Sequence, residues 1–301
     1  MMDRHTTMML ISIGIALVYV ASVHVATRLG ASSLRSRSDS RSDPAVIKRR
    51  VAGVALATLF SVAAASLATR THPADLILGA HASLSKVAIS ALVGAAVPSI
   101  LFFGHLVRCI LQGLPVCEVC QEDTILIVRA LIAAPISEEI CFRSCMVPLF
   151  KAGGFTDTAT IFTLPLVFGL AHLHHIYDSF RERAGPKVNF AHLFLSLFGI
   201  QKRFGSDHAA LANQSAILTQ ILLQSIFQFA YTTVFGWIAT WLLIRTGGGA
   251  IAPIVAHTLC NGFGFPDLSC FAEFGRDRKQ NIIGISYFIG LSGFFALLTF
   301  M

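Results

Sequence analysis

Long apolar segments constrain the fold of this chain more than any other feature of its sequence. The longest lie near residues 8–27, 51–69, 87–107, 155–171, 217–244 and 282–300, and shorter ones near 125–136 and 250–262. A helix of about 20 apolar residues crosses the hydrocarbon core of a bilayer, which is about 30 Å thick. Only 13% of the residues are charged, about half the share in an ordinary soluble domain. The sequence therefore predicts an all-α, polytopic transmembrane helical bundle of about eight spans, with residues 1–301 forming a single membrane-embedded domain.

Basic residues are concentrated in polar loops, and the net charge of +7 by itself is compatible with a nucleic-acid partner. They are not interleaved with aromatic residues on a soluble face, so we expect no nucleic-acid partner. The first polar loop, residues 28–50, is rich in Arg and Ser. The positive-inside rule places it in the cytosol and the N-terminus on the lumenal or external side. A cleaved signal peptide is an alternative for the first segment, but the Arg-rich loop directly after it favours a signal anchor.

A second polar stretch covers residues 176–216 and contains a short apolar run at residues 190–200. This run is too short to span a bilayer and is typical of a helix lying at the membrane interface. Asn213 begins a glycosylation sequon, which would be used only in a lumenal loop.

The seven cysteines are odd in number and irregular in spacing, which does not indicate a disulfide framework. Cys117 and Cys120 form a lone CxxC in a polar loop. A structural zinc site needs two further ligands, and no second CxxC supplies them. We therefore interpret these two cysteines as surface thiols.

Two adjacent glutamates and an arginine lie between the apolar segments, in the sequence Glu138-Glu139-Ile-Cys-Phe-Arg143. A charged side chain at bilayer depth costs about 2.5–3.5 kcal/mol, so such groups usually pair, line a wet cavity or take part in chemistry. Glu139 precedes Arg143 by four residues, which predicts an ion pair on one helix face, whereas Glu138 lies about 100° around the helix and stays free. Pro135 suits the first turn of this helix, which continues past Pro148 only with a break.

Two other segments carry polar groups that could meet this carboxylate. His172 ends one apolar segment, four residues after Phe168, and His257 shares a helical stripe with Asn261. A carboxylate and an imidazole, here Glu138 and His172, can hold and deprotonate a water molecule. Two donors on one stripe can stabilise the oxyanion of a tetrahedral intermediate. If these groups converge, the pattern favours hydrolysis of an amide within or beside the membrane, with no covalent nucleophile.

Two other functions fit the same residues. An intramembrane zinc metalloprotease could use Glu138 with His172, His174 and His257, although the chain contains no HExxH. A non-catalytic scaffold or proton-linked carrier could use the same groups as a proton relay. Asn261 could also tie two helices together instead of contacting a substrate.

The polar residues, taken in order, resemble a known family. Glu138-Glu139-xxx-Arg143, Phe168-xxx-His172 and His257-xxx-Asn261 are similar to the three motifs of the type II CAAX prenyl endopeptidases, within the ABI family of membrane proteases. The resemblance extends to longer stretches, which are residues 136–149, 168–175, 231–236 and 257–267. It covers roughly residues 125–270, the motif-bearing core.

The resemblance implies a role for each matching residue. Glu138 and His172 would activate water, Glu139 and Arg143 would form a supporting pair, and His257 with Asn261 would stabilise the oxyanion. It implies no metal and no cofactor, and a site open to the cytosolic side of the endoplasmic reticulum membrane. The partners would be membrane lipid and prenylated proteins that end in a CAAX sequence, Ras-like GTPases among them, from which the last three residues are removed.

Overall fold

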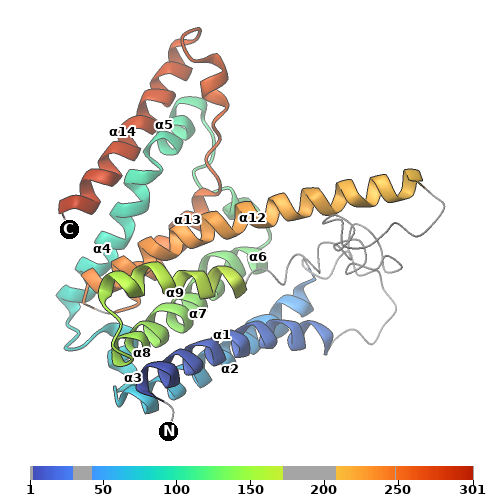
Figure 1. The fold of residues 1–301 in the computed structure, drawn as a ribbon. Coiled ribbons are helices and arrows are strands. Elements are labelled where there is room, and N and C mark those ends of the chain that lie inside the picture. The colour runs from blue at the N-terminus through green and yellow to red at the C-terminus, as the bar shows by residue number, and fades with distance from the viewer. Residues whose placement is uncertain (1–2, 30–42, 172–207, 248, 301) are drawn as a thin grey trace.

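The computed structural model describes residues 3–29, 43–171, 208–247 and 249–300 (Figure 1). Within these ranges the regular structure is entirely helical. The α-helices are α1 (Arg4–Arg28), α2 (Pro44–Thr69), α3 (Pro73–Leu78), α4 (Leu84–Leu101), α5 (Phe103–Gln112), α6 (Thr124–Val128), α7 (Ala134–Glu139), α8 (Met146–Ala152), α9 (Asp157–Ala171), α12 (His208–Arg245), α13 (Ile251–Phe263) and α14 (Arg278–Phe300). Two π-helical segments, η3 (Arg129–Ala133) and η4 (Ile140–Cys145), and two 3₁₀ segments, η2 (Val119–Gln121) and η5 (Ser269–Glu273), complete the set.

The all-α, polytopic membrane fold is confirmed. Five of the described helices are long and apolar enough to cross a bilayer, namely α1, α2, α4, α12 and α14. Two shorter apolar helices, α9 and α13, coincide with predicted segments. The predicted segment 125–136 is part of a longer helical run, so the described helices do not by themselves establish the predicted number of spans.

One predicted span, residues 87–107, is wrong as a single helix. The structure divides it at Phe102 into α4 and α5. Pro98 lies in the last turn of α4, and the N–H of Phe102 donates to its carbonyl at 2.8 Å. Gly104 follows, and a Cβ there would lie 2.3 Å from the ring of Tyr287, so α5 approaches α14 closely at this point. Average hydropathy along the sequence does not reveal such a break, because the residues on both sides of it are apolar.

Two helices begin within the stretches expected to be polar loops. α2 begins at Pro44, within the expected loop 28–50, because Asp43 accepts the N–H of Ala45 at 2.7 Å and proline suits the first helical turn. α12 begins at His208, within the expected stretch 176–216, so the backbone of the Asn213 sequon is helical. The predicted interfacial run at 190–200 lies outside the described residues.

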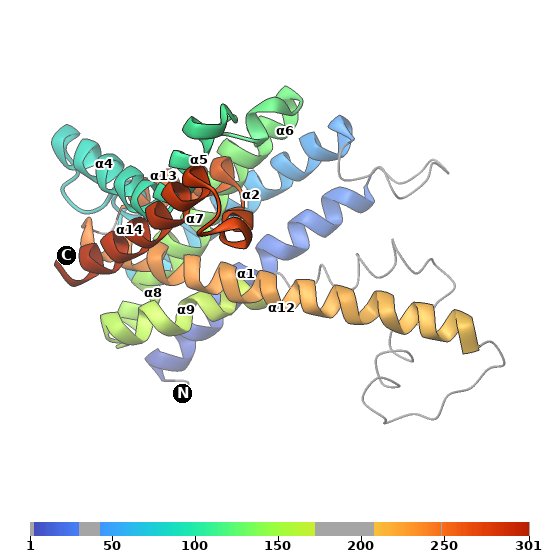
Figure 2. The same cartoon turned by 90° about the horizontal axis from the view of Figure 1, so that it is seen from above.

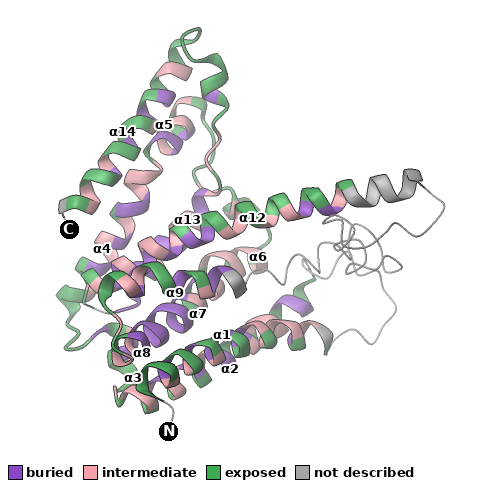
Figure 3. Ribbon diagram, in the orientation of Figure 1, coloured by how far each residue is buried: buried purple, intermediate pink, exposed green. Residues whose placement is uncertain are grey.

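The centre of the bundle is one helical run made of α6, η3, α7, η4 and α8. Helices α1, α2, α9, α12 and α13 pack around it. Buried residues concentrate on the part of this run from α7 to α8 in Figure 3, and every residue of η4 is buried. A helix that is buried on all sides belongs to the core of a large bundle. Glu139 at the α7–η4 junction therefore lies inside the protein, and Glu138 beside it is half-buried.

α5, α14 and the adjoining part of α4 form a limb that leans away from this bundle, and both views show the three helices together (Figures 1 and 2). The limb joins the bundle where α4 packs on α13. A Cβ at Gly94 would lie 2.4 Å from the carbonyl oxygen of Ala252, so the two backbones touch there. Small residues that allow such close approach are common at helix interfaces in membranes.

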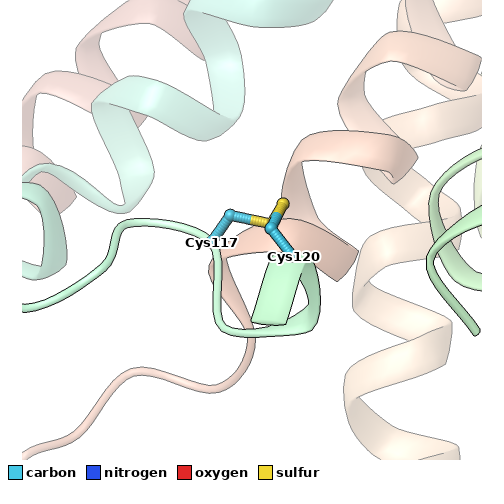
Figure 4. Close-up of a disulfide and its surroundings, with 2 residues drawn as sticks. All are labelled: Cys117 and Cys120. Atoms are coloured by element: carbon cyan, nitrogen blue, oxygen red, sulfur yellow. A yellow bond between two sulfur atoms is a disulfide. The ribbon is translucent and has the colours of Figure 1, made fainter. Parts of the chain in front are cut away.

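The interpretation of Cys117 and Cys120 as surface thiols is wrong. The two cysteines form a disulfide across the short turn of η2 (Figure 4). Their Cα atoms are 5.3 Å apart, within the range that a disulfide spans. The turn packs against the end of α13, where a Cβ at Gly262 would lie 3.6 Å from the Cys117 sulfur.

Candidate active site

Two π-helical segments flank the carboxylate pair in the central run. In η3 the N–H of Ala134 donates to the carbonyl of Arg129, five residues back. A proline follows each segment closely, Pro135 after η3 and Pro148 after η4. Proline leaves an acceptor of the preceding turn unpaired, and a wider turn with neighbouring side chains can accommodate it. The predicted break at Pro148 is therefore replaced by a widened turn, and the helical run continues through α8. Such π-bulges are frequent at functional sites.

The predicted ion pair between Glu139 and Arg143 is confirmed. Arg143 Nη1 lies 3.1 Å from Glu139 Oε1, and both side chains are fully buried. The guanidinium also lies over the ring of Phe168, with its carbon 4.4 Å from the ring centroid. Gly236 leaves room for it, since a Cβ at that position would lie 3.1 Å from Arg143 Nη2. An aromatic face and a carboxylate thus both offset the charge of the buried arginine.

His257 joins this pair from α13. Its Nδ1 lies 2.7 Å from the same carboxylate oxygen, Glu139 Oε1. The imidazole also packs on Phe235 of α12, with ring centroids 4.9 Å apart. A carboxylate accepts, so an ionised Glu139 fixes the hydrogen on Nδ1 and leaves Nε2 of His257 for another partner. Two helical elements far apart in the sequence, the central run and α13, thereby meet at one carboxylate.

Glu138 remains outside this cluster, as the helical spacing predicted. Its side chain is half-buried and has no hydrogen-bond or ion-pair partner among the described residues. The neighbouring Ser137 donates to the carbonyl of Ala133 at 2.7 Å, so the Tyr19 hydroxyl, 2.9 Å away, donates to Ser137 Oγ. This contact anchors α1 beside Glu138. The free carboxylate is thus held on a tightly packed backbone.

Asn261 and Thr258 bind the backbone of η3. Asn261 Nδ2 donates to the carbonyl of Ala130, and Thr258 Oγ1 donates to that of Leu131, both at 2.9 Å. The two donors are three residues apart and therefore share a face of α13. Asn261 does tie two helices together, as one sequence interpretation held. An amide NH₂ has two hydrogens, however, and the second one on this half-buried side chain has no partner among the described residues.

The structure thus brings together most of the predicted site. Glu139, Arg143 and His257 are in direct contact, Glu138 adjoins them, and Asn261 contacts the same helical run. His172 lies outside the described residues.

Sequence reasoning gave no site role to Phe235, Gly236, Thr258 or Tyr19. Phe235 and Gly236 lie in the stretch 231–236, whose family resemblance was the available signal for them. The hydroxyl contacts of Thr258 and Tyr19 have no signature in the sequence.

The described residues contain no group of three or more His, Cys, Asp or Glu side chains that could hold a metal. The ligands of the zinc alternative include His172 and His174, which lie outside these residues, so that alternative stays a prediction. The described part of the cluster leaves Glu139 Oε2 and Arg143 Nη2 without hydrogen-bond partners.

The fold and this cluster define a class of protein: a multi-pass, all-α membrane protein with ionisable groups gathered inside its helical bundle, as in an intramembrane hydrolase. The chain matches the family model described as Type II CAAX prenyl endopeptidase Rce1-like over residues 121–263. It is 30% identical to the probable CAAX prenyl protease 2 of Schizosaccharomyces pombe, over 84% of this chain and 79% of the relative. The chain therefore belongs to the type II CAAX prenyl endopeptidase family.

Other relatives agree with this assignment. The chain is 31% identical to human CAAX prenyl protease 2, over 83% of this chain and 71% of the relative. It is 27% identical to the Caenorhabditis elegans CAAX prenyl protease 2, over 96% and 95% of the two chains. No solved structure matches the chain. The predicted family, and with it the class of membrane-embedded hydrolase, is confirmed.

Proposed function

We propose that this chain removes the C-terminal tripeptide from prenylated proteins that end in Cys-aliphatic-aliphatic-X, as a metal-independent glutamate protease. The observation that carries the proposal is the division of roles within the carboxylate pair. Glu139 is occupied by Arg143 and His257, whereas Glu138 beside it has no described partner. A carboxylate with no partner can act on a water molecule, and a paired one cannot do so without breaking the pair. The names of the relatives support the substrate class.

In the proposed reaction, Glu138 and His172 hold one water molecule and accept its proton. The water oxygen attacks the carbonyl carbon of the prenylated cysteine, whose amide bond links it to the first aliphatic residue. The carbonyl oxygen becomes an oxyanion as its π bond opens. The C–N bond then breaks, the proton passes to the departing nitrogen, and a new C-terminal carboxylate and a free tripeptide result.

His257 and Asn261 are the proposed donors to that oxyanion. Asn261 has one amide hydrogen beyond the one it gives to Ala130. His257 gives its Nδ1 hydrogen to Glu139, so Nε2 donates only when the imidazole carries both protons. The adjacent Glu139 carboxylate stabilises that charged imidazole, which explains a supporting role for the acidic residue. One donor of this kind typically contributes about 10²–10³ in rate.

The proposed setting is the endoplasmic reticulum membrane, with the site open to the cytosolic side. A prenyl chain carries the substrate to the bilayer, because each buried methylene contributes about 0.8 kcal/mol to membrane affinity. Membrane lipid and prenylated proteins such as Ras-like GTPases are the partners that follow from the family resemblance.

The test uses the purified chain in lipid nanodiscs with a farnesylated CAAX peptide and its unprenylated counterpart. We expect release of the tripeptide from the farnesylated peptide alone. Glu138→Gln should lower kcat by at least about 10² while leaving substrate binding in place. Glu122→Gln, a change of the same kind at an exposed loop position, should keep wild-type kcat.

Equal cleavage of both peptides, or wild-type turnover by Glu138→Gln, would contradict the proposal. Activity that is lost with chelator and returns with zinc would favour the metalloprotease instead. Absence of proteolysis in every condition would favour the scaffold or carrier.

A further inference from the structure

Pro135 lies between the carboxylate pair and the carbonyls that bind α13. It has no N–H. In an α-helical register that missing N–H would serve Leu131, four residues back, and in the π register of η3 it would serve Ala130, five residues back. Ala134 already uses the π register, because its N–H donates to Arg129. The single proline thus removes the helix donor for one of two adjacent carbonyls, which sit where the register changes.

Side chains of α13 donate to both of these carbonyls. Thr258 Oγ1 reaches the carbonyl of Leu131, and Asn261 Nδ2 reaches that of Ala130, each at 2.9 Å. An amide is planar, so fixing one N–H of Asn261 also fixes the direction of the other. The geometry of the proposed oxyanion donor therefore depends on a backbone acceptor that a proline leaves open.

We propose that Pro135 is a positioning residue for Asn261: it removes the helix donor for one of the Ala130 and Leu131 carbonyls, so that the α13 donors hold Asn261 with one amide hydrogen directed for the reaction. The inference rests on the proposed function, because it concerns the donor to the oxyanion. Pro135 itself does not touch the substrate. Its contribution is exerted through the Asn261 amide, since oriented donors stabilise charge without reorganising during the reaction.

Pro135→Ala tests this role. Alanine restores the N–H at position 135, which then competes with an α13 donor for the carbonyl of Ala130 or Leu131. Misplacing a positioned group typically costs up to about 10² in rate, so we expect kcat to fall by about 10-fold or more. KM should stay within about twofold and the thermal midpoint should not decrease, because alanine favours a helix interior.

The matched control is Pro148→Ala. It restores an N–H in the same helical run, far from the Ala130 and Leu131 carbonyls that α13 binds. Because those carbonyls keep their α13 donors, kcat should stay within about twofold of wild type. The decisive measurement is the double variant. In an Asn261→Ala background, Pro135→Ala should change kcat by less than about twofold, because the group it positions is already gone.

Wild-type and Asn261→Ala enzymes are measured first on the farnesylated peptide. No wild-type turnover would refute the proposed function and this role with it. Wild-type turnover with an unchanged kcat in Pro135→Ala, or an equal loss in both backgrounds, would overturn the positioning role alone. If Pro135→Ala does not yield folded protein, Pro135→Ser, which also restores the N–H, replaces it. Failure of both variants to fold would also overturn the role, which requires at least wild-type stability.

Discussion

The fully buried charges at the site depend on one residue, Glu139. Its carboxylate contacts both Arg143 and His257, and Phe168 covers the guanidinium. Removing one partner from a buried ion pair leaves an uncompensated charge, which typically costs about 3–5 kcal/mol. The cluster therefore stabilises the bundle only when it is complete, because each charged member would be costly to bury alone.

Arg143→Met tests that dependence. Methionine fills much of the volume but leaves the Glu139 carboxylate with His257 alone, so we expect the free energy of unfolding to fall by about 3–5 kcal/mol. Denaturation in mixed micelles measures it. Arg276→Met changes an exposed arginine outside the bundle and should shift the free energy by less than about 0.5 kcal/mol. Equal effects of the two substitutions would show that the ion pair contributes nothing.

Gly236→Ala tests the space beside the guanidinium. The added Cβ would lie 2.5 Å from Pro165 Cβ and 3.1 Å from Arg143 Nη2, so a neighbour must move. Overpacking of this kind typically costs about 1–3 kcal/mol, and displacement of Arg143 should lower kcat as well. Gly14→Ala is the control, because nothing lies within 4 Å of its Cβ position in α1. A Gly236→Ala enzyme as stable and active as wild type would contradict the described packing.

At the scale of single residues, the sequence predicted the contacts that depend only on the spacing of residues along one helix. The Glu139–Arg143 pair and the separation of Glu138 from it follow from helical geometry alone. The contact between His257 and Glu139 does not, since 118 residues separate them and only the docking of α13 brings them together. Sequence reasoning grouped His257 with Glu138 for the same reason, because no local rule chooses between adjacent carboxylates.

Among the elements, the central run shows how a buried helix accommodates proline. The position of Pro148 predicted a break, whereas the structure retains the run by widening two turns and supplying side-chain donors from α13. The α4–α5 division is the opposite case, since the segment looked continuous and is not. Both outcomes depend on tertiary neighbours, which sequence periodicity does not describe.

Thr258 provides a test at the level of the η3–α13 contact. Thr258→Val keeps the shape but removes the donor to the Leu131 carbonyl, so a partly buried acceptor loses this partner. Such a loss typically costs about 1–3 kcal/mol, and the thermal midpoint should fall accordingly. Thr258→Ser retains the hydroxyl and should lose clearly less stability. If serine and valine behave alike, the hydrogen bond does not hold the two elements together.

At the scale of the whole molecule, the limb of α5 and α14 is held by a contact outside the membrane-spanning helices. Arg108 Nη2 lies 2.7 Å from Asp267 Oδ2, and the N–H of Ser269 also donates to that carboxylate. The Ser269 N–H first, and Arg108 with it, lower the pKa of Asp267 below its usual 3.8. Because the folded-state pKa is lowered, the contact stabilises the limb above about pH 4 and is lost as the pH falls through the lowered value.

Acidification should therefore loosen the limb before it unfolds the bundle. We expect hydrogen exchange in residues 265–277, corrected for intrinsic rates, to rise as the pH falls below about 4. Asp267→Asn should remove that pH dependence. The effect should remain below about 1 kcal/mol, because the carboxylate is 40% exposed and solvent screens the pair. A pH dependence that persists in Asp267→Asn would assign it to another group.

The two ends of the helical bundle differ in the residues that lie there. At one end His5 Nδ1 donates to the Gly153 carbonyl at 3.0 Å, and the Ala250 N–H donates to the Ile77 carbonyl at 2.7 Å. Figure 1 shows the N-terminus, α3 and α8 close together at this end. At the other end Arg50 bonds to Thr27, next to the Arg-rich connection between α1 and α2. α13 begins at the first end, so Asn261, near its far terminus, lies toward the basic end.

This arrangement predicts the orientation of the site. The positive-inside rule puts the basic end in the cytosol and the His5–Gly153 end in the lumen, so substrates would enter from the cytosolic side. A glycosylation acceptor inserted after Gly154, where the structure leaves open space, should be modified when the chain is made in microsomes. The same acceptor inserted within residues 30–42 should stay unmodified and accessible to added protease. The reverse pattern would place the basic loop in the lumen, and the opening of the site would then face away from the compartment in which CAAX proteins are synthesised and prenylated.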